Sequence, residues 1–380
     1  MSKASPTILF VGGGSGGHIY PNVAVLERLD ELGIQINAHF VVSEREIDAT
    51  VLSKAGLAGA AISAKPLSMR PDRFWAFYKA YKLAEEQVLG LIEQTGAKAV
   101  LATGGFVSGP SISAAAKAGI ARALVSLDAV PGKSNRWSAR KASALFSAYE
   151  TPQLNRAQLI SVPLRRSVIG QRSALQARLA LGLDPNLETL LIFGGSQGGG
   201  SINAAFAQLA SRAKSKGMFD GWQLLHLTGE TDRDRVASAY ETAGIAHRVE
   251  AFCAEMGLAW SAATLAVCRA GAGSVAESWA NAVPCLFMPY PYHKDEHQRQ
   301  NAAPIVNRGA GLLLKDRIDE HDNVEELSGP LRDLIRNSVR REQMRQVLKD
   351  SHPPDGAAVL ADWLLGVTGL AVKPESLLQA

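Results

Sequence analysis

The chain alternates short apolar runs with longer amphipathic segments. In its first part, four apolar runs predict buried strands, at residues 8–11, 39–42, 99–102 and 123–127. Apolar residues three or four positions apart predict helices between these runs, at 21–32, 44–55 and 111–118. Strands that are apolar throughout and separated by helices are typical of a parallel sheet covered on both faces. We therefore predict an α/β fold.

The same pattern restarts half a chain later. An apolar run at 190–193 leads into a glycine loop at 194–200, and a helical pattern follows at 202–209. Further apolar runs predict strands at 223–227, 248–252, 264–268 and 285–288. Since each series is headed by its own strand, glycine loop and helix, the repetition predicts two similar doubly wound domains.

The domain bounds follow from the breaks in this pattern. The joint is expected near 163–166, before a helical stretch at 173–181. We therefore predict an N-terminal domain at 1–165 and a C-terminal domain at 166–351. A charged helix around 333–349 is followed by the breaker SHPPDG, and the amphipathic segment 357–370 comes last. Residues 352–380 are expected to pack back onto the first domain.

Length and charge narrow the class of protein. The 380 residues suit two domains, and 47% hydrophobic residues are enough to fill two cores. A net charge of only +4 argues against a nucleic-acid partner. The three cysteines lack metal-ligand spacing and are typical of reduced thiols. The first residues contain too short an apolar run for a secretory signal, and no stretch approaches ~20 apolar residues, so any membrane contact should be peripheral.

Two glycine loops carry the first candidate chemistry. Each lies between a predicted strand and a predicted helix, at 12–17 and 194–200. Glycines at such a turn let backbone N–H groups approach an anion, and the helix N-terminus adds partial positive charge. Neither loop is followed by the Lys-Ser/Thr of a Walker motif, and the GxGxxG spacing at 12–17 is weak evidence alone. The loops predict phosphate binding; the alternative is a tight turn that serves packing.

His18 stands where the first helix begins. The helix dipole disfavours a cationic imidazole at this end, so a neutral histidine that acts as a general base is plausible. The alternative is a histidine that only hydrogen-bonds the backbone. A further glycine turn, TGGFVSGP at 103–110, follows another strand of the same predicted sheet and should face the same side as the first loop.

The stretch 268–302 is the densest in polar chemistry. A predicted strand ends near Arg269, and a helix that carries Glu277 follows two glycines. A carboxylate there can accept hydrogen bonds from both hydroxyls of a ribose, although Glu277 on a solvated helix face is the alternative. The polar loop at 293–300 suits sugar hydroxyls. Its two histidines and two acids match no common metal spacing, so we predict no metal.

The segment 65–82 combines aromatic and basic residues. Phe74, Phe77, Tyr78 and Tyr81 share one helical face, and five basic residues stand against Asp72 alone. An aromatic face with basic flanks suits the surface of an anionic bilayer. We expect a membrane-facing set: Phe74, Trp75, Phe77, Tyr78 and Tyr81. The alternative is an aromatic stripe that faces the core.

Taken together, these motifs resemble those of one family. GGGSGGHIYP, TGGFVSGP, GGSQGG and CRAGAGSVAE…HKDEHQRQNA are similar, in the same order, to motifs of the UDP-N-acetylglucosamine–N-acetylmuramyl-(pentapeptide) pyrophosphoryl-undecaprenol N-acetylglucosamine transferases of glycosyltransferase family 28. The resemblance implies two facing Rossmann-like domains, the glycosyltransferase B architecture. It also implies an inverting, metal-independent enzyme without a cofactor, peripheral on the cytoplasmic face of the bacterial inner membrane.

The resemblance implies a reaction and its substrates. The family moves N-acetylglucosamine from UDP-N-acetylglucosamine to the C4 hydroxyl of lipid I, which gives lipid II for peptidoglycan. In the first domain, Ser15, Gly16 and Gly17 would lie beside both substrates, Asp128 would match a binding asparagine, and His18 would be the base. For the donor, the resemblance implies contacts from these residues: Arg165, Ser196, Cys253, Ala272, Gly273, Ser274, Val275, Ala276, Glu277 and Gln298.

The sequence also departs from the family pattern. Val125, Ser126 and Leu127 replace the usual His-Glu-Gln before Asp128, and His297 replaces the first of a glutamine pair. Four alternatives therefore remain beside the lipid I transferase. They are a transferase of the same fold with another acceptor, a UDP-sugar epimerase, a dinucleotide-dependent oxidoreductase and a UDP-sugar sensor without catalysis.

Overall fold

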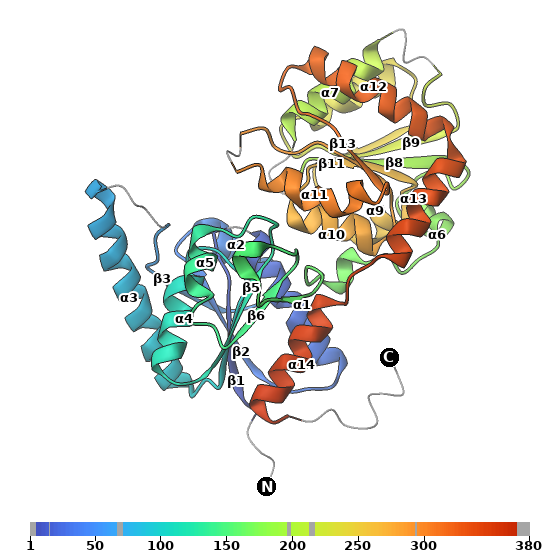
Figure 1. Cartoon of the computed structure of the whole chain (residues 1–380). Coiled ribbons are helices and arrows are strands. Elements are labelled where there is room, and N and C mark those ends of the chain that lie inside the picture. Colours follow the sequence, from blue (N-terminus) through green and yellow to red (C-terminus); the bar gives the residue numbers. More distant parts are fainter. Residues whose placement is uncertain are drawn as a thin grey trace. The chain divides into compact units, whose positions relative to one another are not determined.

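A computed structural model describes residues 5–14, 16–66, 71–195, 199–212, 217–292 and 295–370. The chain splits into two compact units. The first unit is Met1–Arg165 with Pro353–Ala380, and the second is Arg166–His352. Figure 1 shows that each unit is a central sheet with helices on both faces.

The first unit contains a parallel sheet of seven strands in the order β3-β2-β1-β4-β5-β6-β7. The strands are β1 (Thr7–Val11), β2 (Asn37–Ser43), β3 (Gly59–Ile62), β4 (Ala99–Ala102), β5 (Ala121–Ser126), β6 (Ala144–Ser147) and β7 (Gln158–Leu159). All five residues of β1 are buried, as expected for the central strand of a covered sheet. Chain order reverses between β1 and β4, the position where open parallel sheets bind ligands.

Six helices of the described chain belong to this unit: α1 (Gly16–Glu31), α2 (Glu46–Lys54), α3 (Pro71–Thr95), α4 (Ser108–Lys117), α5 (Lys133–Ser138) and α14 (Gly356–Thr368). The C-terminal helix α14 packs against α1. Two backbone contacts fix its start, because the Ser161 N–H donates to the Pro354 carbonyl at 2.8 Å and the Gly356 N–H donates to Ser161 Oγ at 2.9 Å. An ion pair joins Arg28 of α1 to Asp355.

The second unit repeats this strand order. Its parallel sheet runs β10-β9-β8-β11-β12-β13. The strands are β8 (Glu188–Phe193), β9 (Trp222–Leu227), β10 (His247–Glu250), β11 (Leu265–Cys268), β12 (Cys285–Phe287) and β13 (Gly311–Leu313). The helices are α6 (Ala174–Ala180), α7 (Gly200–Ser211), α8 (Arg233–Thr242), α9 (Met256–Ala262), α10 (Ala272–Ala280), α11 (His297–Asn307), α12 (Glu320–Arg336) and α13 (Ser338–Asp350).

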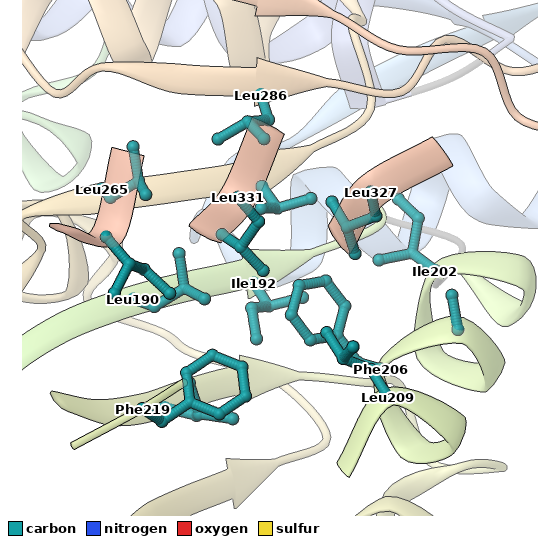
Figure 2. Packing of buried hydrophobic residues seen from close by; sticks show 14 of the residues in the cluster. Leu190, Ile192, Ile202, Phe206, Leu209, Phe219, Leu265, Leu286, Leu327 and Leu331 are labelled. Carbon is teal, nitrogen blue, oxygen red and sulfur yellow. The ribbon is translucent and has the colours of Figure 1, made fainter. Parts of the chain in front are cut away.

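One face of the second sheet packs against α7 and α12. Figure 2 shows Leu190 and Ile192 of β8 beside Phe206 of α7 and Leu331 of α12, all of them buried. The opposite face is covered by a second cluster that includes Trp260 of α9. Because both faces are apolar and covered, ligands can reach this sheet only at the ends of its strands.

The predicted strands of both series are confirmed to within two residues, and two helices differ from the prediction. Helix α1 begins at Gly16, five residues before the predicted start, and Pro21 lies inside it. The helix predicted around 333–349 is confirmed from residue 338 onward as α13, whereas residues 333–336 belong to α12. Asn337 separates the two helices, and its side chain accepts from the Arg340 N–H and caps α13.

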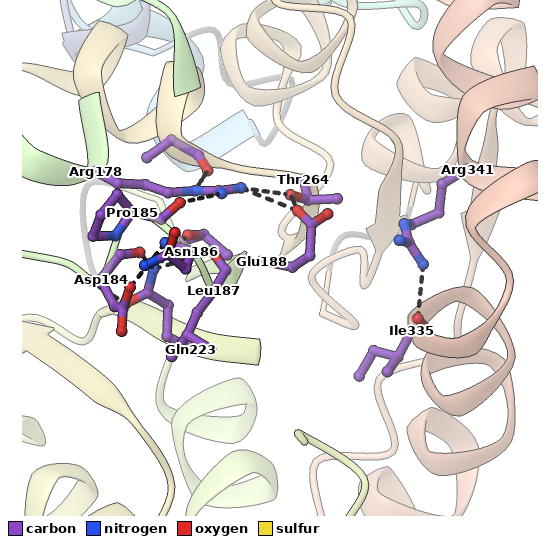
Figure 3. A network of polar contacts seen from close by, with 12 residues as sticks. Arg178, Asp184, Pro185, Asn186, Leu187, Glu188, Gln223, Thr264, Ile335 and Arg341 are labelled. Atoms are coloured by element: carbon purple, nitrogen blue, oxygen red, sulfur yellow. Dashed lines mark hydrogen bonds and ion pairs between the residues drawn. The ribbon is translucent and has the colours of Figure 1, made fainter. Parts of the chain in front are cut away.

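A polar network closes the end of the second sheet opposite its glycine turns. Figure 3 shows Arg178 of α6 reaching Glu188 and Thr264, which lie at the amino ends of β8 and β11. Arg178 Nη2 donates to Glu188 Oε2 at 3.0 Å, and Arg178 Nη1 donates to the Pro185 carbonyl at 3.2 Å. Nearby, Arg341 Nη1 donates to the Leu334 and Ile335 carbonyls at the end of α12. Both arginines donate to backbone carbonyls of the unit and so contribute to its stability.

A buried carboxylate ties α3 to α4 in the first unit, and its loss should measurably lower stability. Glu85 is 1% exposed and accepts hydrogen bonds from Lys117, Ser113 and Lys82. Burial alone would raise the pKa of Glu85, but these bonds lower it to about 2. Glu85→Gln should reduce the free energy of unfolding at pH 7 by about 1–3 kcal/mol. Denaturant titration at several pH values measures this difference.

The sign of the pH dependence follows from the depressed pKa. The carboxylate stabilises the native state fully above its ordinary pKa of 4.5, and this contribution is lost as pH falls toward 2. The difference between wild type and Glu85→Gln should therefore shrink from pH 4.5 downward. A difference that stays constant down to pH 2 would contradict this assignment.

Candidate active site

The glycine turns of the first unit meet at the carboxyl ends of β1 and β4. The Gly12 N–H donates to the Val41 carbonyl at 3.1 Å, and the Thr103 N–H donates to the Val11 carbonyl at 2.9 Å. Thr103 Oγ1 donates to the His18 carbonyl at 2.5 Å. These bonds hold the turn after β1, the start of α1 and the turn after β4 together at the switch point of the sheet.

Two glycines in these turns are required by close backbone approach. A Cβ on Gly12 would lie 2.0 Å from the His18 carbonyl oxygen. A Cβ on Gly105, whose φ is +79°, would lie 2.1 Å from the Gly13 carbonyl oxygen. These two glycines therefore serve local packing, one of the two readings of the sequence.

His18 lies in the first turn of α1 with its ring against Gly104, where an added Cβ would lie 2.8 Å from His18 Cδ2. Burial lowers the pKa of His18 below its ordinary 6.5. The charge of Asp128, a hydrogen bond with the Gly13 backbone and the charge of Asp48 act in the opposite direction and do not outweigh burial. The imidazole is therefore neutral at pH 7, as a general base requires.

Asp128 follows β5 at the same edge of the sheet and is the one partly exposed residue of the stretch that departs from the family. Val125, Ser126 and Leu127 are buried within or directly after β5. Because their side chains lie in the core, the replacements at these three positions change the interior of the unit, and Asp128 presents the remaining polar group. Burial and then the charge of Asp128 raise the pKa of the buried Tyr149 hydroxyl, so this tyrosine stays protonated.

Asp48 is a residue of this site that sequence reasoning missed. It lies in the first turn of α2, it is fully buried, and its carboxylate accepts from the Gly14 N–H at 2.8 and 3.0 Å. An acidic residue in the first turn of a helix is common and reads as solvated. The sequence feature that could have indicated Asp48 was Ser43, a short polar residue at the end of a strand, whose hydroxyl donates to Asp48 Oδ2.

Some predicted donor residues lie in the turn and first turns of α10. The helix begins at Ala272 after the cap residue Gly271, and Ala272, Gly273 and Ser274 are partly buried. Their backbone N–H groups belong to the positive end of the helix. The side chains of Val275 and Ala276 pack in the core at 1% and 8% exposed. A helix can present only one stripe to a ligand, so these two residues could contribute backbone alone.

Glu277 sits one turn further along α10 and is partly buried. Its Oε2 accepts from the indole N–H of Trp260 at 2.8 Å. Trp260 belongs to the core of the unit and packs edge-on against Phe193, with ring centroids 5.6 Å apart. The carboxylate is therefore held by a rigid partner, and the solvated alternative for Glu277 is wrong.

Cys253 lies between β10 and α9, and Gln298 lies in the first turn of α11. Burial raises the pKa of the Cys253 thiol, so this residue is not an activated nucleophile. Gln298 Oε1 accepts from the Tyr290 N–H at 2.8 Å. Ser15, Ser196, His293 and Lys294 lie outside the described residues. Within the described ranges, no group of three histidines, cysteines or acids could hold a metal ion.

Arg269 organises the turns of the second unit and was not predicted as a site residue. It follows β11 directly, is 8% exposed, and its Nη1 lies 2.6 Å from Asp316 Oδ2. Its Nη2 donates to Ser201 Oγ at 2.8 Å, and Ser201 Oγ donates to Asp316 at 2.6 Å. Because Ser201 is the second residue of α7 and Asp316 follows β13, this network fixes the first turn of α7 against the ends of β11 and β13.

Arg165, the last residue of the first unit, places its guanidinium 4.0 Å from the centre of the Tyr20 ring. Tyr20 lies on α1, two residues beyond His18. The guanidinium is therefore held by a cation–π contact beside the helix that carries the candidate base.

The predicted membrane-facing set on α3 is only partly exposed. Phe74, Trp75 and Tyr78 are 38%, 67% and 43% exposed, and Phe77 is partly buried. The prediction is wrong for Tyr81, which is 7% exposed and donates from its hydroxyl to the Gly109 carbonyl at 3.0 Å. It lies three residues beyond Tyr78, on the edge of the stripe that packs on α4, and burial raises its pKa to about 12. Among described residues, no helix is long and apolar enough to cross a membrane.

Two Rossmann-like sheets, each with glycine turns at the carboxyl ends of its central strands, define the glycosyltransferase B architecture. A family model described as the glycosyltransferase family 28 N-terminal domain matches residues 8–147. A model described as the C-terminal domain of the same family matches residues 189–359. The chain belongs to glycosyltransferase family 28.

Individual relatives agree with this assignment. The chain is 32% identical over 371 residues to the UDP-N-acetylglucosamine–N-acetylmuramyl-(pentapeptide) pyrophosphoryl-undecaprenol N-acetylglucosamine transferase of Geobacter sulfurreducens, across 95% of this chain and 98% of the relative. The crystal structure of Acinetobacter baumannii MurG matches with a TM-score of 0.73 at 21% identity, over 95% of this chain and 99% of that one.

A UDP-GlcNAc 2-epimerase from Neisseria meningitidis matches with a TM-score of 0.62 at 14% identity, over 96% of this chain and 100% of that one. Since a transferase and an epimerase share this fold, the structural likeness shows the fold alone. The family assignment rests on the sequence matches.

Proposed function

We propose that this protein transfers N-acetylglucosamine from UDP-N-acetylglucosamine to the C4 hydroxyl of lipid I and so forms lipid II for peptidoglycan. The observation that carries the proposal is the relationship, along 95% of the chain, to a transferase whose name states this donor and acceptor. The site chemistry agrees with it, because a neutral His18 is available to accept a hydroxyl proton and a rigidly held Glu277 is available to bind a ribose.

On the donor side, backbone N–H groups at the start of α10 and the loop around Ser196 would bind the diphosphate, and Arg165 would add positive charge. Cys253 would meet the uracil through its backbone. Gln298 would contact the N-acetylglucosamine ring. Negative charge develops on the diphosphate as the sugar leaves, and oriented N–H groups at a helix N-terminus stabilise such charge.

On the acceptor side, Ser15, Gly16 and Gly17 would lie beside both substrates, and Asp128 would bind near them. His18 would take the proton of the C4 hydroxyl as its oxygen attacks the anomeric carbon of the donor. Attack on the face opposite the departing UDP inverts that carbon. The imidazolium that forms is stabilised by the nearby charges of Asp128 and Asp48, which favour the protonated ring.

The decisive experiment measures UDP release from UDP-N-acetylglucosamine in EDTA, with and without a lipid I analogue. We expect release that depends on the acceptor, together with a disaccharide product of the correct mass. An epimerase would convert the donor without an acceptor, and a sensor would bind the donor and release no UDP. Either result would overturn the proposal.

A lipid-linked acceptor requires the enzyme to reach a bilayer, and we propose that the exposed aromatic patch of α3 docks on the cytoplasmic face of the inner membrane. The patch consists of Phe74, Trp75 and Tyr78, with Lys79 and Lys82 beside it. Exposed aromatic rings enter the headgroup region, and adjacent lysines are attracted to anionic lipid.

The double variant Phe74→Ser/Trp75→Ser should lose most of its binding to vesicles that contain anionic lipid, because it removes two of the three exposed aromatic rings of the patch. Co-sedimentation measures the bound fraction. Tyr292→Ser is the matched control, since Tyr292 is 63% exposed but belongs to the second unit. Equal binding by the double variant and wild type would contradict the docking surface.

A further inference from the structure

Two side chains at the start of α2, those of the cap residue Arg45 and of Asp48 in the first turn, bond the backbone of Gly14. Asp48 accepts from the Gly14 N–H at 2.8 and 3.0 Å through its two carboxylate oxygens. Arg45 Nη1 donates to the Gly14 carbonyl at 3.1 Å, and its guanidinium lies 5.1 Å from the centre of the Phe106 ring. Gly14 is thereby held at both its amide and its carbonyl, four residues before His18.

The Asp48 carboxylate is held rigidly because it is fully buried and accepts several hydrogen bonds. Its Oδ2 also accepts from the Ser43 N–H at 3.1 Å and from Ser43 Oγ at 2.5 Å. A Cβ on Gly13 would lie 2.7 Å from the same oxygen, so the carboxylate packs directly on the glycine turn. A buried acceptor with this many donors cannot move without leaving N–H groups unsatisfied.

The glycine turn that Asp48 bonds also contacts His18, the candidate base. His18 forms a hydrogen bond with the Gly13 backbone, and its ring edge rests on Gly104. The charged groups that face His18 from the described elements are Asp128, after β5, and Asp48, on α2. The turn after β4 contributes the uncharged Thr103 and Gly104. The orientation of the ring therefore depends on where the Gly13–Gly14 peptide is held.

We propose that Asp48 and Arg45 are positioning residues for the transfer reaction, which act through the Gly13–Gly14 peptide to set the orientation of the His18 ring. This inference rests on the proposed function, in which His18 takes the acceptor proton. Neither residue belongs to a glycine motif, so no motif of the sequence assigns them this role. A base displaced by about 1 Å can lose about 100-fold in rate, which makes a positioning role measurable.

Asp48→Asn tests the carboxylate with an isosteric side chain. The amide cannot accept from every donor that the carboxylate satisfies, so the Gly14 peptide should shift. We expect kcat to fall about 10- to 100-fold while the KM for UDP-N-acetylglucosamine stays within about twofold. The acid limb of the kcat profile should move to lower pH, because the variant removes a charge that raises the pKa of His18. A merely structural role would lower the melting temperature and leave kcat in place.

Arg45→Met removes the donor to the Gly14 carbonyl. Because Arg45 is exposed, this variant should fold even if Asp48→Asn does not. We expect a fall in kcat of about 3- to 10-fold with an unchanged acceptor KM. A rise in acceptor KM with unchanged kcat would show instead that Arg45 binds substrate, and it would overturn the positioning role of that residue. Wild-type kcat and pH profile in both variants would overturn the whole inference.

Glu85→Gln is the matched control for loss of a buried carboxylate. Glu85 is as buried as Asp48, lies in the same unit, and bonds lysines of α3 and α4 instead of the glycine turn. In detergent with a soluble lipid I analogue, it should keep the wild-type kcat. The proposed function is tested separately by wild type itself: no acceptor-dependent UDP release would end that proposal, whereas wild-type kcat and pH profile in both Asp48→Asn and Arg45→Met would end only this inference.

Discussion

His18→Ala should lower the rate of acceptor-dependent UDP release by about 10²- to 10⁴-fold, with little change in donor affinity. A positioned general base contributes a factor of this size because it removes the hydroxyl proton as the new bond forms. Donor affinity should persist, since the donor residues proposed in the second unit are untouched. Steady-state kinetics gives the rate, and calorimetry with UDP-N-acetylglucosamine gives the affinity.

The control for this variant is His39→Gln. His39 lies on β2 of the same unit and is exposed, so its loss removes a histidine without touching the glycine turns. It should retain wild-type turnover. Turnover of His18→Ala within a few-fold of wild type would assign the proton to another group, and Asp128, whose charge raises the pKa of His18, would be the first carboxylate to test.

The pH dependence gives a second check on the same residue. A base works when it is neutral, and burial lowers the pKa of His18 below 6.5. The acid limb of kcat/KM should therefore lie below pH 6.5. Asp128→Asn should shift this limb to lower pH, because it removes a charge that favours the protonated ring. A shift toward higher pH would contradict this account.

The sequence predicted the frame of the fold because the relevant signal is local. Apolar runs marked the central strands β1, β4, β8 and β11, since a strand covered on both faces must be apolar throughout. The edge strand β7 has only two residues, both exposed, and so carries no such signal. Helix ends were less certain: Asn337 breaks a charged pattern that otherwise continues smoothly from α12 into α13.

The sequence predicted the site residues that lie within motifs. It missed those whose role depends on contacts with residues distant in sequence. His18 and Glu277 stand inside glycine motifs and could be found. Asp48 lies 34 positions from Gly14, and Arg269 lies 47 positions from Asp316, so nothing local indicates that these pairs meet. Tyr81 was misplaced for a related reason, because a helical stripe fixes which residues share a face but not where that face meets the protein.

Glu277→Ala should weaken binding of UDP-N-acetylglucosamine by about 1–3 kcal/mol, or roughly 5- to 150-fold in dissociation constant. The expected loss reflects two hydroxyl contacts that only a carboxylate, with two acceptor oxygens, satisfies together. The size of the effect depends on rigidity: Trp260 holds one side of the carboxylate in a fixed core, so little entropy is lost when a ribose binds. Calorimetry with the donor and with UDP alone measures both affinities.

Two further variants separate the ribose contact from other effects. Glu277→Gln keeps an oxygen that can accept from the Trp260 indole, so its stability should stay near wild type while one ribose contact is lost. Its affinity should fall between those of wild type and Glu277→Ala. Glu241→Ala removes an exposed carboxylate from α8 of the same unit and should leave donor binding unchanged.

UDP should lose as much affinity as the full donor, because the ribose belongs to both, whereas a contact with the sugar ring would weaken the donor alone. If Glu277→Ala binds both ligands as wild type does, then the carboxylate is only a core anchor for Trp260. The ribose must in that case be held by backbone groups at the start of α10.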